Sequence, residues 1–207
     1  MTERGMIFNA EMVRAILEGR KTQTRRPVKF PVHDKNLGCE LAGNELAGEL
    51  SAGNYLNSAF GKPGDRIWVR ETFQGPLFDF DLMDSYCKDP TPFEKPEFCV
   101  YKADGVPAPE FYDADDELHC CWRPSIHMPR WASRILLEIT GVRVERLKSI
   151  SDGDAIREGC STADMKSGDC VADVFARLWA SIYGSDSWNA NPWVWVIEFK
   201  RDEGGAA

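Results

Sequence analysis

Apolar residues recur at the helical period in the last third of the chain. Residues 171–182 place them at i, i+3, i+4, i+7, i+8 and i+11 before Gly184: Val171, Val174, Phe175, Leu178, Trp179 and Ile182. This spacing predicts an amphipathic helix, and we assign the whole apolar face to the core.

Two shorter helices are predicted from their end signals. Asn9 precedes an apolar stripe over residues 12–17, and Gly19 follows it, which is the usual order of a helix cap and a helix-ending glycine. Ser151 and Asp154 form a capping box of the S-x-x-D type, so a helix is expected to begin there and to end at Gly159.

Alternating segments predict the strands. Residues 66–73 follow a Gly-Asp turn, 98–102 form a short segment, and 193–199 are almost entirely apolar. In residues 135–147 the alternation shifts by one position at Gly141, as a β-bulge would produce. Together with the helices, these strands predict an α+β fold.

Two regions lack clear periodicity. Residues 31–60 have a glycine at every fifth position from 38 to 53, and residues 75–129 are rich in proline and aspartate. We interpret both as loop-rich insertions in a single domain spanning 1–207, whose core comprises roughly 5–30, 61–74 and 130–202.

The composition of the chain limits the cellular compartment and the classes of partner that we expect. The chain has 207 residues, 28% of them charged, and no apolar run of 18 residues or signal-peptide segment, so we expect a cytoplasmic protein without a membrane partner. Its seven cysteines form no C-x-x-C pair, which favours free thiols. A net charge of -8 argues against a long duplex-DNA footprint.

A basic segment stands out in this acidic chain. Residues 14–29 contain six cations and one acid, and residues 19–26 include no apolar side chain. An anionic ligand is one interpretation. The other is a solvated helix exit, whose cations complement the helix dipole.

The spacing G-x-K-x-x-T-x-R, carried by Gly19, Lys21, Thr24 and Arg26, resembles the signature of the ASCH family, which is related to PUA-like RNA-binding domains. The resemblance implies a small mixed β-barrel flanked by short helices. The layout with M-P-R-W-A-S-R before the long strand is similar to a longer ASCH variant found in prophage-type proteins.

Some small bacterial ASCH members hydrolyse the acetyl amide of acetylated cytidine. The resemblance therefore implies an amidohydrolase of a modified nucleoside, with Lys21, Thr24 and Glu158 as catalytic residues. Either neutral Lys21 activates Thr24, or Glu158 activates water while charged Lys21 stabilises the oxyanion. Lys21 and Thr24 would lie on opposite faces of a strand, so a shared site requires a turn over residues 20–24.

Four further residues are candidates for substrate binding: Arg20, Arg26, Trp68 and Trp131. The alternatives to hydrolysis are a non-catalytic module that binds RNA or a nucleotide, and a ribonuclease. The expected partner is thus a modified nucleoside or a short single-stranded RNA. We expect no cofactor and no metal, although His119-Cys120-Cys121 offers zinc-binding atoms.

Overall fold

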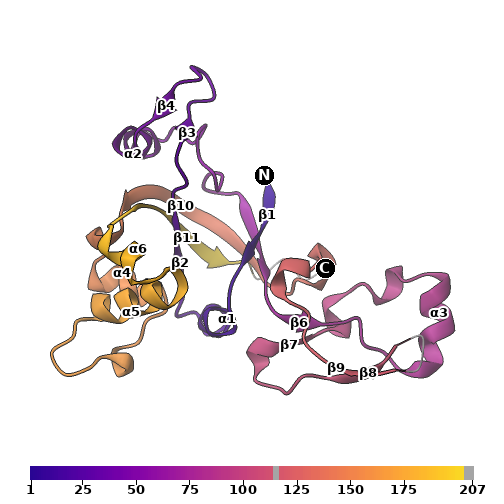
Figure 1. Ribbon diagram of the computed structural model, residues 1–207. Helices are drawn as coiled ribbons and strands as arrows, with labels where there is room; N and C mark the ends of the chain where they lie inside the picture. Colours follow the sequence, from indigo (N-terminus) through magenta and orange to yellow (C-terminus); the bar gives the residue numbers. More distant parts are fainter. Residues whose placement is uncertain (114–116, 203–207) are drawn as a thin grey trace. The chain divides into compact units, whose positions relative to one another are not determined.

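The computed structural model describes residues 1–113 and 117–202, which form two compact units (Figure 1). The first unit comprises Met1–Thr2, Ala15–Arg66 and Glu138–Arg201. The second comprises Glu3–Arg14, Ile67–Leu137 and residue 202. Each unit therefore draws on segments that are distant in the sequence.

Helices and strands are mixed along the chain, so the α+β class is confirmed. The helices are α1 Ala10–Leu17, α2 Gly43–Ser51, α3 Met83–Lys88, α4 Asp152–Arg157, α5 Val171–Tyr183 and α6 Ser185–Asn189. The strands are β1 Glu3–Ile7, β2 Gln23–Pro27, β3 Val32–His33, β4 Glu40–Leu41, β5 Arg66–Arg70, β6 Phe73–Gln74, β7 Val100–Tyr101, β8 Glu110–Tyr112, β9 Leu118–Cys120, β10 Leu136–Arg146 and β11 Trp193–Arg201.

The largest sheet has the order β1-β5-β10-β11-β2, and three further sheets have two strands each. In the first unit β10, β11 and β2 are consecutive, and in the second β1 and β5 are consecutive. Because β1 and β2 end the order, the sheet is open, and no sheet among the described residues is closed. The expected barrel is therefore not confirmed.

The predicted helix ends are confirmed. The Asn9 side chain accepts a hydrogen bond from the Met12 amide at 2.8 Å, and Gly19 has a φ of 73° after α1. The Ser151 hydroxyl accepts from the Asp154 amide at 3.1 Å before α4. These bonds satisfy amides that the first helical turn leaves without partners.

The predicted strand phases are also visible in burial. In β5, Ile67 and Val69 are buried. In β10, the buried positions change from 137 and 139 to 142 and 144, which is the shift expected at Gly141.

Residues 31–60, expected to be loop-rich, contain regular secondary structure. This segment contains the β3–β4 hairpin and α2, in which Leu46 and Leu50 are buried one helical turn apart. A Cβ on Gly43 would lie 2.3 Å from Nε1 of Trp193, so only glycine permits this approach. The apolar face of α2 consists mainly of these two leucines, so the regularly spaced glycines around them gave no helical signal. Residues 75–129, expected to be loop-rich, likewise include α3 and the paired strands β8 and β9.

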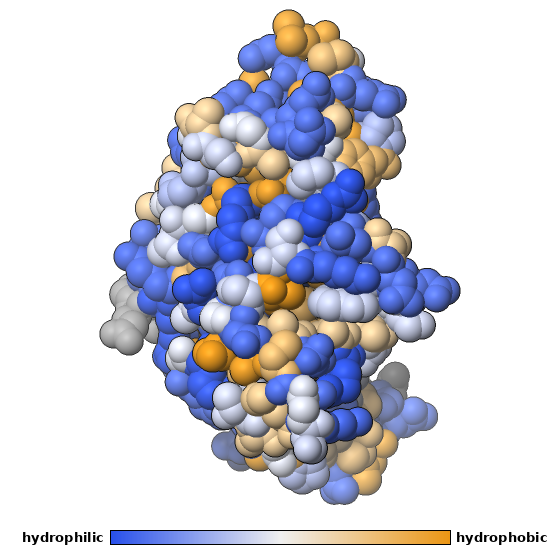
Figure 2. All heavy atoms as spheres, turned by 90° about the vertical axis from the view of Figure 1, so that its left-hand side faces the viewer, coloured by the Kyte–Doolittle hydropathy of each residue, from blue (hydrophilic) through white to orange (hydrophobic). Residues whose placement is uncertain are grey.

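The first unit contains an apolar core between α4, α5 and β11 (Figure 1), to which Leu147 and Ile150 also contribute. Val171, Phe175 and Trp179 contribute from α5. Ile182, which the pattern assigns to the core, is instead 43% exposed because it lies in the last turn of the helix. Polar residues dominate the face seen in Figure 2, with apolar residues in small groups.

Within the described residues, no helix combines the length and the apolar character needed to cross a membrane.

Candidate functional site

Strand β2 separates the residues of the G-x-K-x-x-T-x-R motif onto two faces. It pairs antiparallel with β11, with Thr24 opposite Ile197, Arg25 opposite Val196 and Arg26 opposite Trp195. Side chains alternate along a strand, so Thr24 and Arg26 share one face and Arg25 lies on the other. The Arg25 guanidinium is 5.7 Å from the ring centroid of Phe175, which identifies its face as the one covered by α5.

Lys21 is enclosed on the helix-covered side. Its Nζ donates to Oε2 and to the backbone oxygen of Glu158, both at 2.8 Å, and its side chain is 0% exposed. An isolated β-bridge joins the two residues. Gly159 has a φ of 94°, and a Cβ there would lie 3.3 Å from Cβ of Lys21. The glycine that ends α4 therefore allows Glu158 to approach Lys21.

Arg25 ties the same carboxylate to two others. Its Nη1 donates to Oε1 of Glu158 at 3.1 Å, and its Nη2 donates to Oε1 of Glu145 at 2.7 Å. Asp154 lies 3.5 Å from Nη2. Glu158 is thus held by a lysine through one oxygen and by an arginine through the other, a geometry that fixes its orientation.

Burial shapes the electrostatics of this cluster. It lowers the pKa of Lys21, and the Glu158 carboxylate opposes that change only in part. Burial also raises the pKa of the nearby Cys160 thiol to about 11. At Asp154 burial is outweighed by hydrogen bonds from Arg157 and Ser151, which hold its pKa below the ordinary value.

Sequence reasoning missed Gln23, an unnamed position inside the motif. Gln23 shares the face of Arg25, and its amide nitrogen and oxygen are buried without a hydrogen-bond partner among the described residues. The same holds for Nε of Arg25. Buried polar atoms of this kind are rare, so this face retains donors and an acceptor that are suited to a small polar molecule. No local pattern indicated it, because the sequence did not predict a strand over residues 23–27.

The other face of β2 carries a cavity. Arg26 and Trp195, which are cross-strand partners, line a space of about 470 Å³ together with Pro27, Lys29, Val32, Asn57, Ala59, Phe60 and Tyr183. Phe60 meets Trp195 edge to face at 5.8 Å between centroids. Two cations and three aromatic rings therefore surround one cavity in the first unit.

A second cavity differs in chemistry. It has a volume of about 570 Å³ and is lined by Phe30, Pro31, Glu40, Leu41, Ala42 and Glu45. Its charged lining residues are both carboxylates. An anionic ligand is thus better suited to the cavity beside Arg26.

The structure brings together only some of the predicted site residues. Lys21 and Glu158 are in contact, although 137 positions separate them. Thr24 lies on the opposite face, because residues 23–27 form a strand rather than the turn that a shared site requires. Arg20 is exposed and donates to Glu18 at 2.6 Å.

The two predicted tryptophans belong to the second unit. Trp68 lies beneath the Arg70 guanidinium, 5.4 Å from its ring, and Trp131 packs against the cluster that contains Phe73 and Tyr101. Both are half-buried and contribute to packing in that unit. Within the described residues, Cys120 and Cys121 do not join a cluster of three metal-binding side chains.

Comparisons with protein-family models, with curated proteins and with solved structures found no match.

Proposed function

We propose that this chain binds a phosphorylated nucleoside, either free or as the terminal nucleotide of a short single-stranded RNA. One observation carries the proposal: Arg26 of the motif lies directly across from Trp195 in the lining of a cavity of about 470 Å³. That volume is within the range of about 300–1,000 Å³ typical of small-molecule sites. The ASCH resemblance, with its PUA-like fold, is part of this proposal and supplies the nucleoside as ligand class.

The lining fits the two parts of such a ligand. Arg26 and Lys29 offer positive charge to a phosphate, and an arginine can bind two phosphate oxygens at once. Phe60, Tyr183 and Trp195 provide aromatic surface for a base. Asn57 also lines the cavity, where its side-chain amide is held by hydrogen bonds to Asp34 and Glu49.

The test is calorimetric titration with cytidine 5′-monophosphate, cytidine and a short oligoribonucleotide. Losing a charged hydrogen bond costs about 1.5–3 kcal/mol, so Arg26→Ala should weaken binding of the monophosphate by about tenfold or more. Cytidine, which lacks the phosphate, should be affected much less. Arg20→Ala is the matched control, because Arg20 belongs to the same motif but does not line the cavity.

Two results contradict the proposal. One is the absence of binding to any of the three probes by the wild-type chain. The other is an equal loss of affinity in Arg26→Ala and Arg20→Ala, which would indicate a general electrostatic attraction.

Hydrolysis of an acylated nucleoside is the second candidate, and a specific observation favours it. Nζ of Lys21 lies 2.8 Å from Oε2 of Glu158, so an ammonium and a carboxylate meet at one point. Of the two expected mechanisms, this geometry favours the one in which Glu158 activates water and Lys21 stabilises the oxyanion. The mechanism with Thr24 as nucleophile has less support, since strand alternation separates Thr24 from Lys21.

Acetate release from N4-acetylcytidine tests this candidate. We expect Lys21→Met and Glu158→Gln to abolish release and Thr24→Val to retain it. If the wild-type chain releases no acetate, the hydrolysis proposal is wrong, whereas the proposal of nucleotide binding is not affected. Gel analysis of RNA incubated with the protein tests the ribonuclease alternative, for which shortened RNA is the required result.

A further inference from the structure

A cluster outside the proposed nucleotide site has the composition of a metal site. It lies in the second unit, on the hairpin formed by β8 and β9, where Phe111 pairs with His119. The two rings stack with centroids 5.4 Å apart and an interplanar angle of 24°. This stacking restrains the imidazole, so its nitrogens have a defined direction.

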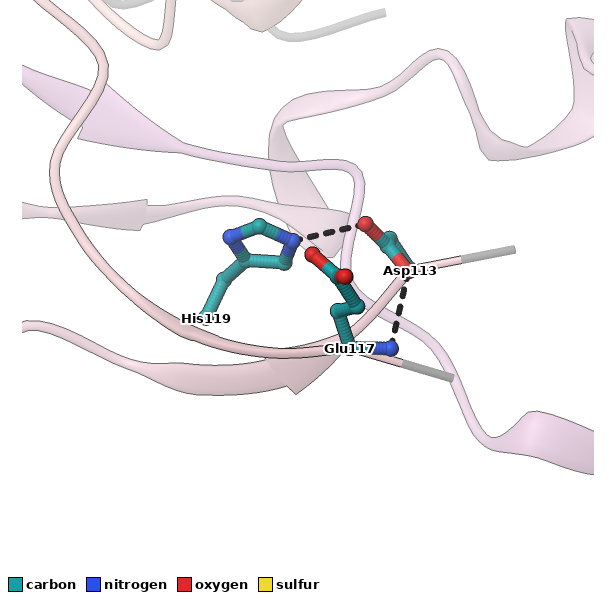
Figure 3. Close-up of side chains that lie close together, drawn as sticks. All are labelled: Asp113, Glu117 and His119. Atoms are coloured by element: carbon teal, nitrogen blue, oxygen red, sulfur yellow. Dashed lines mark hydrogen bonds and ion pairs between the residues drawn. The ribbon is translucent and has the colours of Figure 1, made fainter. Parts of the chain in front are cut away.

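Two carboxylates approach the same imidazole. Nε2 of His119 lies 2.7 Å from Oδ2 of Asp113, while Oδ1 of Asp113 accepts a hydrogen bond from the Glu117 amide at 3.0 Å. The carboxylate of Glu117 completes the group, and one ligand atom from each residue lies within 4.8 Å of the others. Figure 3 shows the three side chains pointing toward one another.

We infer that Asp113, Glu117 and His119 bind a divalent transition-metal ion of the zinc class. One imidazole nitrogen and two carboxylate oxygens form a ligand set that zinc accepts, with water in the remaining position. The imidazole distinguishes the set from the all-oxygen sites preferred by calcium and magnesium. His119 and Asp113 are both partly exposed, so an ion reaches them from solvent.

Metal binding replaces the hydrogen bond between His119 and Asp113. The ligating nitrogen must present a lone pair, so a proton on Nε2 is released to solvent or the ring adopts the tautomer protonated at Nδ1. Oδ2 of Asp113 then binds the ion instead of the ring. The two carboxylates neutralise the charge of a divalent ion.

The chain contains a matched control in the first unit. His33 also lies on a hairpin and faces one carboxylate across it, with Nε2 4.0 Å from Oε1 of Glu40. His33 therefore resembles His119 in lying on a hairpin close to a carboxylate, but among the described residues it lacks a third metal-binding side chain. If three ligands are required, His33→Ala should leave metal affinity unchanged.

The experiment titrates metal-free, reduced full-length protein with Zn²⁺ against a chromogenic chelator. We expect one tight site, with affinity reduced by at least about tenfold in both His119→Ala and Asp113→Asn, because even residues that only orient a ligand contribute this much. Co²⁺ absorption provides a second measurement. Oxygen and nitrogen ligands should yield d–d bands without the charge-transfer band of a thiolate.

Three outcomes overturn the inference. The first is the absence of a tight site in the wild-type protein. The second is an equal affinity in wild type and His119→Ala, and the third is a thiolate charge-transfer band that persists in His119→Ala, which would assign the ion to cysteines. Circular dichroism of each variant shows whether its fold is retained.

Discussion

Glu158 in the first unit and Glu71 in the second are both buried carboxylates that accept hydrogen bonds from arginine, and their surroundings differ. Glu158 lies between Lys21 and Arg25, whose side chains are both 0% exposed. Glu71 is bound by Arg134 through both oxygens, at 3.0 and 3.1 Å, and Arg134 is 22% exposed. In the first cluster both cations are enclosed by protein, while the cation of the second cluster is partly exposed.

The two clusters also differ in the further contacts that their cations make. Arg134 also binds Asp104 at 2.7 Å and lies 3.9 Å from the ring centroid of Tyr101. Removing Glu71 would leave Arg134 with a second carboxylate, an aromatic face and water. Removing Glu158 would leave the enclosed Lys21 ammonium with no carboxylate partner among the residues that the structure describes. An ion pair therefore becomes indispensable when its cation has no alternative partner.

The largest expected effect is that of Glu158→Gln. It removes the charge facing two enclosed cations, and breaking such a pair costs about 3–5 kcal/mol of the free energy of unfolding. Chemical denaturation followed by tryptophan fluorescence measures this loss. Glu18→Gln is the control, because its pair with Arg20 is exposed on both sides. A loss below about 1 kcal/mol would contradict the importance given to enclosure.

Glu71→Gln should have a smaller effect, about 1–3 kcal/mol, which is the usual range for leaving a buried polar partner unsatisfied. Arg134 retains Asp104, and burial already raises the pKa of Glu71 despite its arginine partner. The same denaturation experiment checks it. A loss equal to that of Glu158→Gln would remove the distinction between the two clusters.

The pH dependence of stability should differ in sign between the clusters. Burial lowers the pKa of Lys21, so folding releases a proton, and stability should rise with pH between that lowered value and 10.5. The pKa of Glu71 is raised, so stability should rise as pH falls from that value toward 4.5. The contribution of each residue is the difference in the free energy of unfolding between the wild type and the variant, which is Lys21→Met for one cluster and Glu71→Gln for the other.

Denaturation curves at several pH values measure these differences. A wild-type advantage over Lys21→Met that shrinks toward pH 10.5 would reverse the sign assigned to Lys21. Such a result would mean that attraction to Glu158 outweighs burial.

Asp104→Asn should have the smallest effect, below about 1 kcal/mol, because Asp104 is 40% exposed and pairs at the solvent side of Arg134. The loss of stability in Asp104→Asn should be smaller still in high salt, because salt screens exposed charges. Thermal denaturation at low and high ionic strength provides the check. A salt-independent loss would instead indicate that Asp104 positions Arg134 for Glu71.

Part of the candidate site was predictable from local signals. Gly159 and the capping box at Ser151 located Glu158 at the end of a helix, and the resemblance to the ASCH signature suggested its association with Lys21. Strand alternation would separate Thr24 from Lys21, and this consequence of a strand was predictable. That β2 begins at Gln23 was not, because the basic segment has no alternating apolar pattern.

Local order along the chain was set by the amino-acid sequence: the caps of α1 and α4, the apolar stripe of α5 and the phase shift within β10 all depend on neighbouring residues. The partners of the buried charges were decided by folding. Arg25 meets Glu145 and Glu158 from positions more than a hundred residues away, and α2 was revealed by its packing against Trp193. Periodicity records which face of an element is apolar, whereas the choice of counter-charge depends on which distant elements pack together.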